Sequence, residues 1–95
     1  MPARGWSAFG GVSYMHYLYI IQSLVKNWKY IGVTEDLEKR LALHNSGATR
    51  SAKPYRPLKI IYHEAYNNKA EALIREHCLK KNFKAREEIY KSLGI

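Results

Sequence analysis

The sequence lacks most of the features that mark secreted and membrane-spanning proteins. Cys78 is the single cysteine, which excludes an intrachain disulfide framework and a cysteine-based zinc site. No apolar run approaches the roughly 20 residues that a membrane-spanning helix requires. Residues 5–14 also lack the continuous apolar core of a signal peptide. We therefore expect a cytoplasmic protein that is neither secreted nor inserted in a membrane.

Acidic residues are scarce as well: eight Asp and Glu stand against sixteen Lys and Arg, giving a net charge of +8. Such a surplus on a chain of 95 residues favours a polyanionic partner, namely DNA, RNA or an anionic membrane. No acidic residue lies between Glu38 and Glu64. The cations of this window gather on a Pro-containing loop and not along one helical face, which argues against a membrane surface.

This acid-free window predicts a surface that follows the phosphates of a nucleic acid. Tyr55 is available there to stack on a base or to pack on a sugar. An ordinary solvated loop explains the same composition and remains the alternative. The predicted nucleic-acid-binding residues are Lys39, Arg50, Lys53, Tyr55 and Arg56.

The length leaves room for one small domain. Residues 1–14 are rich in Gly and show neither a helical nor a strand period of apolar residues. We interpret them as a flexible tail before a domain at 15–95. Aromatic and β-branched residues predict strands, and helical periods with capping residues predict helices. The predicted strands are 16–23, 29–33 and 58–65, with the first two joined as a hairpin.

The predicted helices have recognisable ends. Thr34 is the expected N-cap of a first helix, and Gly47 supplies its stop. A second helix starts after Asn67 or Asn68 and runs to about residue 81, and a third covers roughly 86–93. The order β-β-α-β-α-α predicts an α+β domain with a small, three-stranded, mostly antiparallel sheet.

Several side chains suit catalysis, although each also has an ordinary structural explanation. Strand alternation places Tyr17 and Tyr19 on one face, where half-buried sheet tyrosines are common. Arg40 precedes His44 by one helical turn, so the two share a helix face. Glu76 is expected on the core-facing side of the second helix, where a carboxylate needs a hydrogen bond, an ion pair or a bound cation. The neighbouring candidates for an ion pair are Arg75 and Lys80.

Together these residues resemble the GIY-YIG nuclease domain over residues 16 to about 91. The second signature triplet stands intact as Tyr30-Ile31-Gly32, whereas Tyr17-Leu18-Tyr19 occupies the first and keeps only its final tyrosine. Arg40 matches the motif arginine ten residues after the first tyrosine of the intact triplet. His44 stands where family members carry Tyr or His, and Glu76 matches the metal-binding glutamate. The chain is similar to the small, stand-alone bacterial members.

The resemblance implies a three-stranded antiparallel sheet flanked by helices and hydrolysis of a phosphodiester bond with a single divalent cation, Mg²⁺ or Mn²⁺. Glu76 would hold the metal, and Arg40 would donate to the non-bridging phosphate oxygens. Tyr19 is the preferred residue for orienting or deprotonating the attacking water, with His44 relaying the proton. Tyr30 is the other candidate for this role and would otherwise bind the phosphate.

The chain also departs from the family pattern. Val33 and Thr34 stand where members often have a lysine, which alters the substrate contacts expected there. DNA is favoured over RNA as the partner. A homodimer would allow one small domain to cut both strands, and a partner protein is the other candidate, since the domain has no targeting module. The alternative function is a non-catalytic nucleic-acid-binding module that retains the nuclease fold.

Overall fold

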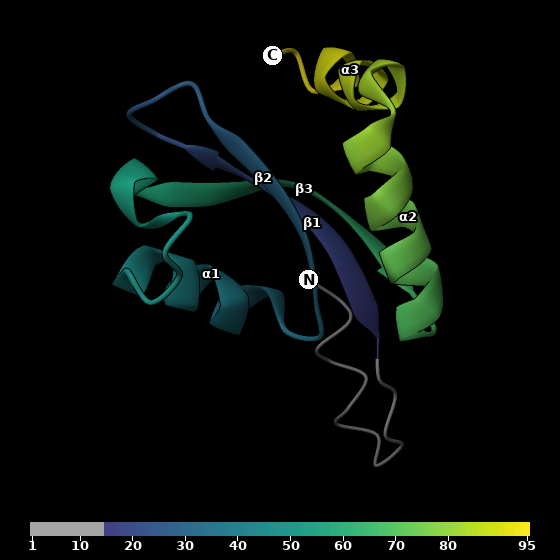
Figure 1. Cartoon of the computed structure of the whole chain (residues 1–95), viewed down its shortest axis with the longest axis horizontal. Coiled ribbons are helices and arrows are strands. Elements are labelled where there is room, and N and C mark those ends of the chain that lie inside the picture. Colours follow the sequence, from purple (N-terminus) through teal and green to yellow (C-terminus); the bar gives the residue numbers. More distant parts are fainter. Residues whose placement is uncertain (1–14) are drawn as a thin grey trace.

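The computed structural model describes residues 15–95, and the tail predicted at 1–14 lies outside the described residues. Figure 1 shows a sheet with helices on both of its faces. No helix within the described part of the chain is long and apolar enough to cross a bilayer. The elements are, in chain order, β1 (His16–Ser23), β2 (Lys29–Thr34), α1 (Leu37–Ser46), η2 (Lys53–Tyr55), β3 (Leu58–Tyr66), α2 (Lys69–Lys81) and α3 (Phe83–Ser92).

The sheet confirms the predicted fold class. Its strand order is β2-β1-β3 with both pairings antiparallel. The strand β1 takes the centre because it is apolar on both faces, and the run from Tyr17 to Ile21 is buried throughout. In the register, Tyr19 lies opposite Gly32 of β2 and opposite His63 of β3. The strand β2 is therefore an open edge of the described sheet.

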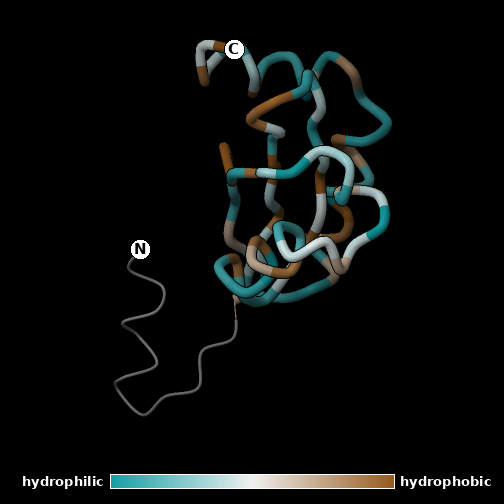
Figure 2. Tube along the Cα trace, turned by 90° about the vertical axis from the view of Figure 1, so that its left-hand side faces the viewer, coloured by the Kyte–Doolittle hydropathy of each residue, from teal (hydrophilic) through white to brown (hydrophobic). Residues whose placement is uncertain are grey.

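Each face of β1 supports its own apolar cluster. Leu18 and Ile20 pack with residues of α2 and α3, including the fully buried Leu79. Tyr19 and Ile21 pack on the other face, with residues of α1 and η2. Because one strand serves both clusters, the helices flank the sheet on opposite sides (Figure 1). Figure 2 shows hydrophobic and hydrophilic segments alternating along the folded chain, as amphipathic elements require.

The start of α1 corrects one prediction. Asp36, not Thr34, is the N-cap, and its carboxylate accepts a hydrogen bond from the Lys39 amide at 3.1 Å. Thr34 is the last residue of β2 and pairs with Tyr17, so its backbone belongs to the sheet. Its hydroxyl accepts from the Asp36 amide at 3.2 Å and shapes the turn between the two elements. The predicted stop at Gly47 is confirmed, with φ of 86°.

The remaining helix ends are set by two asparagines. Asn68 caps α2 by accepting from the Glu71 amide at 2.8 Å, which confirms the predicted capping pair. The third helix begins at Phe83, earlier than the predicted 86, because the Asn82 side chain accepts from the Ala85 amide at 3.1 Å. Asn82 thus ends α2 and starts α3 within one residue.

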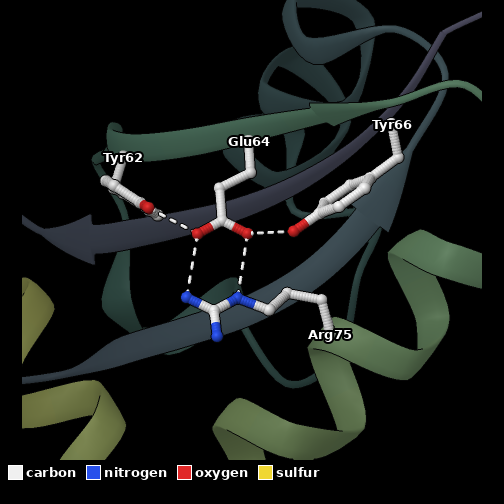
Figure 3. A network of polar contacts seen from close by, with 4 residues as sticks. All are labelled: Tyr62, Glu64, Tyr66 and Arg75. Carbon is white, nitrogen blue, oxygen red and sulfur yellow. Dashed lines mark hydrogen bonds and ion pairs between the residues drawn. The ribbon is translucent and has the colours of Figure 1, made fainter.

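A polar cluster fastens α2 to β3, as Figure 3 shows. Arg75 of α2 donates to both carboxylate oxygens of Glu64, at 3.0 and 3.1 Å. The hydroxyls of Tyr62 and Tyr66 donate to the same carboxylate. Arg75 therefore pairs with Glu64. Of the two residues predicted as ion-pair partners of Glu76, it is Lys80 that pairs with it. The cluster holds α2 at the residue that precedes Glu76.

Candidate active site

Three of the predicted catalytic side chains form one aromatic cluster. Tyr19 comes from the central strand, Tyr30 from the edge strand and His44 from α1. Their ring centroids lie 5.5 Å apart for Tyr30 and His44, 5.9 Å for Tyr19 and His44, and 6.5 Å for the two tyrosines. The cluster lies on the α1 face of the sheet, beside the open edge of β2.

A chain of two hydrogen bonds runs through this cluster. The Tyr19 hydroxyl lies 2.9 Å from Nε2 of His44, and Nδ1 of His44 lies 2.9 Å from Oγ1 of Thr49. Both Tyr19 and His44 are 2% exposed. With its proton on Nδ1, the imidazole donates to Thr49 and accepts from Tyr19. This arrangement leaves Nε2 able to take the phenolic proton.

Gly32 makes room for the Tyr19 ring. A Cβ atom at Gly32 would lie 2.5 Å from the Tyr19 hydroxyl oxygen and 2.7 Å from Cζ, closer than atoms can pack. The ring lies against the backbone of the strand opposite, which only glycine permits. Glycine is thus needed at this position of the intact triplet because it lets the Tyr19 phenol lie beside His44.

Burial and neighbouring charges set the protonation of the cluster. Burial, and then the charge that Tyr30 carries when ionised, raise the pKa of Tyr19 well above its usual value. The charge of Arg40 and hydrogen bonding to it act in the opposite direction, while Glu76 adds to the rise. Burial, with the Arg40 charge second, lowers the pKa of His44. At neutral pH the pair is therefore a neutral phenol and a neutral imidazole.

Arg40 and Glu76 complete the set of five. Each is close enough to act electrostatically on the Tyr19 hydroxyl, although they come from helices on opposite faces of the sheet. The open edge at β2 allows this meeting, because no further strand of the described sheet separates α1 from α2 there. The structure thus brings all five predicted positions to one place.

Glu76 is the single carboxylate among these five residues. Its side chain is 21% exposed and accepts from Lys80 Nζ at 3.2 Å. The described residues contain no group of three or more His, Cys, Asp or Glu that could hold a metal. A single carboxylate suits Mg²⁺ or Mn²⁺, since Mg²⁺ keeps several waters and takes phosphate oxygens as further ligands. Glu76 fits that donor set, whereas a zinc site would need more protein ligands.

The residues predicted to bind nucleic acid occupy the surface that continues from α1. Lys39 lies on α1, whereas Arg50 precedes η2 and Lys53 opens it; all three are exposed. Arg56 donates from Nε to the Lys53 carbonyl at 2.9 Å. A shallow depression of about 530 Å³ lies beside them and is lined by Asn45, Lys53, Pro54, Arg56 and Pro57.

Tyr55 has a stacking partner, Trp28, that was not predicted from the sequence. Its ring stacks on Trp28, with centroids 4.3 Å apart and planes at 2°. Trp28 in turn stacks with Tyr30, at 6.0 Å and 15°. A row of three aromatic rings therefore connects the loop that carries Arg50, Lys53 and Arg56 (the basic loop) with the cluster of Tyr19, Tyr30 and His44. Trp28 directly precedes β2 and lies outside both the predicted and the observed strand, so strand alternation gave no signal for its stacking on Tyr30.

The sequence of this chain is similar to a characterised domain family and to several bacterial proteins. The profile of the GIY-YIG catalytic domain matches residues 15–90. The UPF0213 protein YazA of Bacillus subtilis is 34% identical over 76 residues, covering 79% of this chain and 76% of that protein. The UPF0213 protein SSP2268 of Staphylococcus saprophyticus is 38% identical over 66 residues, covering 68% of this chain and 79% of that protein.

A solved structure supports the fold. The solution NMR structure of the UPF0213 protein BH0048 from Bacillus halodurans superposes with a TM-score of 0.50 and is 28% identical. The match covers 83% of this chain and 84% of that one. The architecture of sheet and helices described above is therefore shared with a protein determined by experiment.

Proposed function

The chain belongs to the GIY-YIG catalytic domain family, and from that premise we propose that it is a divalent-metal-dependent endonuclease that acts on DNA in the cytoplasm. A structure-selective nuclease is included in this proposal. The observation that carries it is the buried hydrogen bond between Tyr19 and His44, placed within electrostatic reach of Arg40 and Glu76. An isolated tyrosine–histidine contact would need neither a cation nor a carboxylate beside it.

Proton transfer follows from the protonation of the pair. Tyr19 accepts a hydrogen bond from the attacking water and gives its own proton to Nε2 of His44. The water oxygen forms its bond to phosphorus as its proton passes to the phenol, and the bond to the leaving oxygen breaks. A phenol with a raised pKa is a poor base by itself, so the imidazole is the proton acceptor. The Thr49 hydroxyl can accept from Nδ1 of His44, which leaves Nε2 free to take the proton.

Charge stabilisation is the task of Arg40 and Glu76. The Arg40 guanidinium donates to the non-bridging oxygens as charge builds up on them. Glu76 holds the divalent cation, which when bound polarises the phosphate and stabilises the leaving oxygen. The exposed cations of the basic loop hold the flanking phosphates. Tyr30 contacts the phosphate from the edge strand.

The test is cleavage of a panel of duplex, single-stranded and branched DNA and of RNA, with Mg²⁺, Mn²⁺ or EDTA. We expect cutting of DNA that requires the metal. The Glu76→Gln variant should lose at least about 100-fold in rate, within the range of an essential catalytic group. Glu88→Gln, on the exposed face of α3, is the matched control and should cut normally. Salt-sensitive binding of the panel without any cutting would instead identify a non-catalytic nucleic-acid-binding module.

A further inference from the structure

Lys80 lies beside two residues of the candidate active site, Glu76 and Tyr30. Its Nζ is 3.2 Å from Oε2 of Glu76 and 5.6 Å from the centroid of the Tyr30 ring. Residues 76 and 80 are one turn apart on α2, and the buried Leu79 orients this turn against the sheet. The helix therefore places an ammonium and a carboxylate side by side, with the ammonium near the Tyr30 ring.

The pair has little structural purpose of its own. The Lys80 side chain is 49% exposed and that of Glu76 is 21% exposed. An ion pair at this spacing that is open to solvent contributes little to stability. Lys80 is the more exposed partner of the two, so its ammonium is accessible to an incoming phosphodiester. The Tyr30 ring beneath Lys80 favours a cation at this place.

We propose that Lys80 is a phosphate-binding residue of the site, paired with Glu76 in the free protein and released to the substrate when a divalent cation takes the carboxylate. The proposal rests on the proposed function, because it assumes that Glu76 is the metal ligand. A divalent cation on Glu76 repels the ammonium that occupied the same oxygen. The freed ammonium has three donors and finds the incoming phosphate as its nearest anion. Metal binding and substrate binding are thereby coupled through one side chain.

The first test measures metal affinity without any turnover. Free Mn²⁺ is determined by electron paramagnetic resonance for the wild type and for Lys80→Met, with Lys81→Met as control. Lys81 is the adjacent exposed lysine on the same helix and carries the same charge. Lys80→Met removes the competitor, so we expect Mn²⁺ to bind about three- to tenfold more tightly. Lys81→Met should change the affinity less than about twofold, and Glu76→Gln should abolish binding.

The second test measures the phosphate contact. Fluorescence anisotropy of a labelled DNA oligonucleotide is recorded in a Tyr19→Phe background, so that the DNA remains intact. Relative to the background protein, the added Lys80→Met change should weaken binding about three- to tenfold in Mn²⁺ and less than about twofold in EDTA. The added Lys81→Met change should weaken it equally in both.

Three outcomes overturn the proposal in distinguishable ways. Unchanged Mn²⁺ affinity in Lys80→Met, together with loss in Glu76→Gln, removes the competitor role and leaves the proposed function intact. Undiminished Mn²⁺ binding by Glu76→Gln removes the metal ligand itself, and with it both the proposed function and the role of Lys80. An equal loss of DNA affinity in Mn²⁺ and EDTA for Lys80→Met overturns the release step.

Discussion

The hydroxyl of Tyr19 and Nε2 of His44 lie 2.9 Å apart in the interior of the protein, although 25 positions separate them in the chain. Tyr19 stands on the central strand and His44 near the end of α1, so the contact requires the helix to fold back over the sheet. The glycine opposite Tyr19 and the threonine behind His44 hold the two partners in place.

The Tyr19 hydroxyl is expected to be essential for cleavage. Tyr19→Phe removes the group that passes the proton to His44, and the rate should fall by at least about 100-fold. It also leaves a buried imidazole nitrogen without its partner, at a cost of about 1–3 kcal/mol in the free energy of unfolding. Tyr17→Phe is the control, because Tyr17 shares the strand face but contacts His63. A Tyr19→Phe protein that cuts at the wild-type rate would exclude this proton path.

Most of the fold could be predicted from local patterns. The first strand has the predicted bounds because His16–Ser23 is rich in aromatic and β-branched residues, with two tyrosines and two isoleucines between Tyr17 and Ile21. Gly47 and Asn68 end and begin helices by local hydrogen bonding, which the sequence displays. The predicted start of α1 was wrong because Thr34 and Asp36 are both good N-caps. Only the pairing of Thr34 in the sheet decides between them.

A motif names the candidate site residues, whereas tertiary packing chooses their partners. Tyr30, Arg40, His44 and Glu76 each contact Tyr19 or act on it electrostatically, and their roles in catalysis stay predictions. Thr49 gives no signal in the sequence, since its bond to His44 depends on how the chain turns after Gly47. The sequence offered Arg75 and Lys80 equally as partners of Glu76, and Glu64 on β3 decided the choice by binding Arg75.

The Arg40 charge should be visible in the titration of His44. Burial and this charge lower the pKa of His44, so Arg40→Gln should raise it, whereas Lys39→Gln on the exposed side of α1 should not. Histidine ring NMR signals followed from pH 4 to 8 measure the shift. Because the folded pKa lies below the ordinary value, the associated stability is present above about pH 6.5 and is lost as pH falls through the folded pKa. An unchanged His44 pKa in Arg40→Gln would contradict the electrostatic contact.

Loss of Arg40 should affect catalysis more than folding. The guanidinium is the donor to the phosphate in our proposal, so Arg40→Gln should reduce cleavage by about 100-fold or more. The melting temperature should stay within a few degrees of the wild type, as for other changes that leave the core intact. A large drop in the melting temperature would instead assign Arg40 a structural role.

The Glu64 cluster should make the domain sensitive to acid. Burial raises the pKa of Glu64. The hydrogen bonds from Arg75, Tyr62 and Tyr66 lower it by more than burial raises it, so the pKa lies below its ordinary 4.5. The stabilisation is therefore complete above the unfolded pKa and is lost as pH falls through the folded value. The free energy of unfolding, measured with urea, should fall from pH 7 to pH 3 more steeply for the wild type than for Glu64→Gln. Parallel pH profiles would show that the cluster does not fasten α2.

The basic loop should contribute to the salt dependence of nucleic-acid binding. Lys53→Ala combined with Arg56→Ala removes two cations, so the slope of log affinity against log salt should become shallower by up to about two units. Lys84→Ala with Lys91→Ala on α3 removes the same charge from another surface and is the control. An equal change of slope in both double variants would mean that net charge, and not this loop, governs binding.

Gly32→Ala should displace the Tyr19 ring and so report on the link between the signature glycine and the site. The added methyl group would lie 2.5 Å from the Tyr19 hydroxyl oxygen, so the ring must move away from His44. We expect a destabilisation of about 1–3 kcal/mol, as for other overpacked interiors, together with loss of cleavage. A double-mutant cycle with Tyr19→Ala isolates the cause, since the methyl group no longer meets a ring there. If Gly32→Ala costs as much in the Tyr19→Ala background, the glycine serves the backbone of β2, and the contact with Tyr19 is incidental.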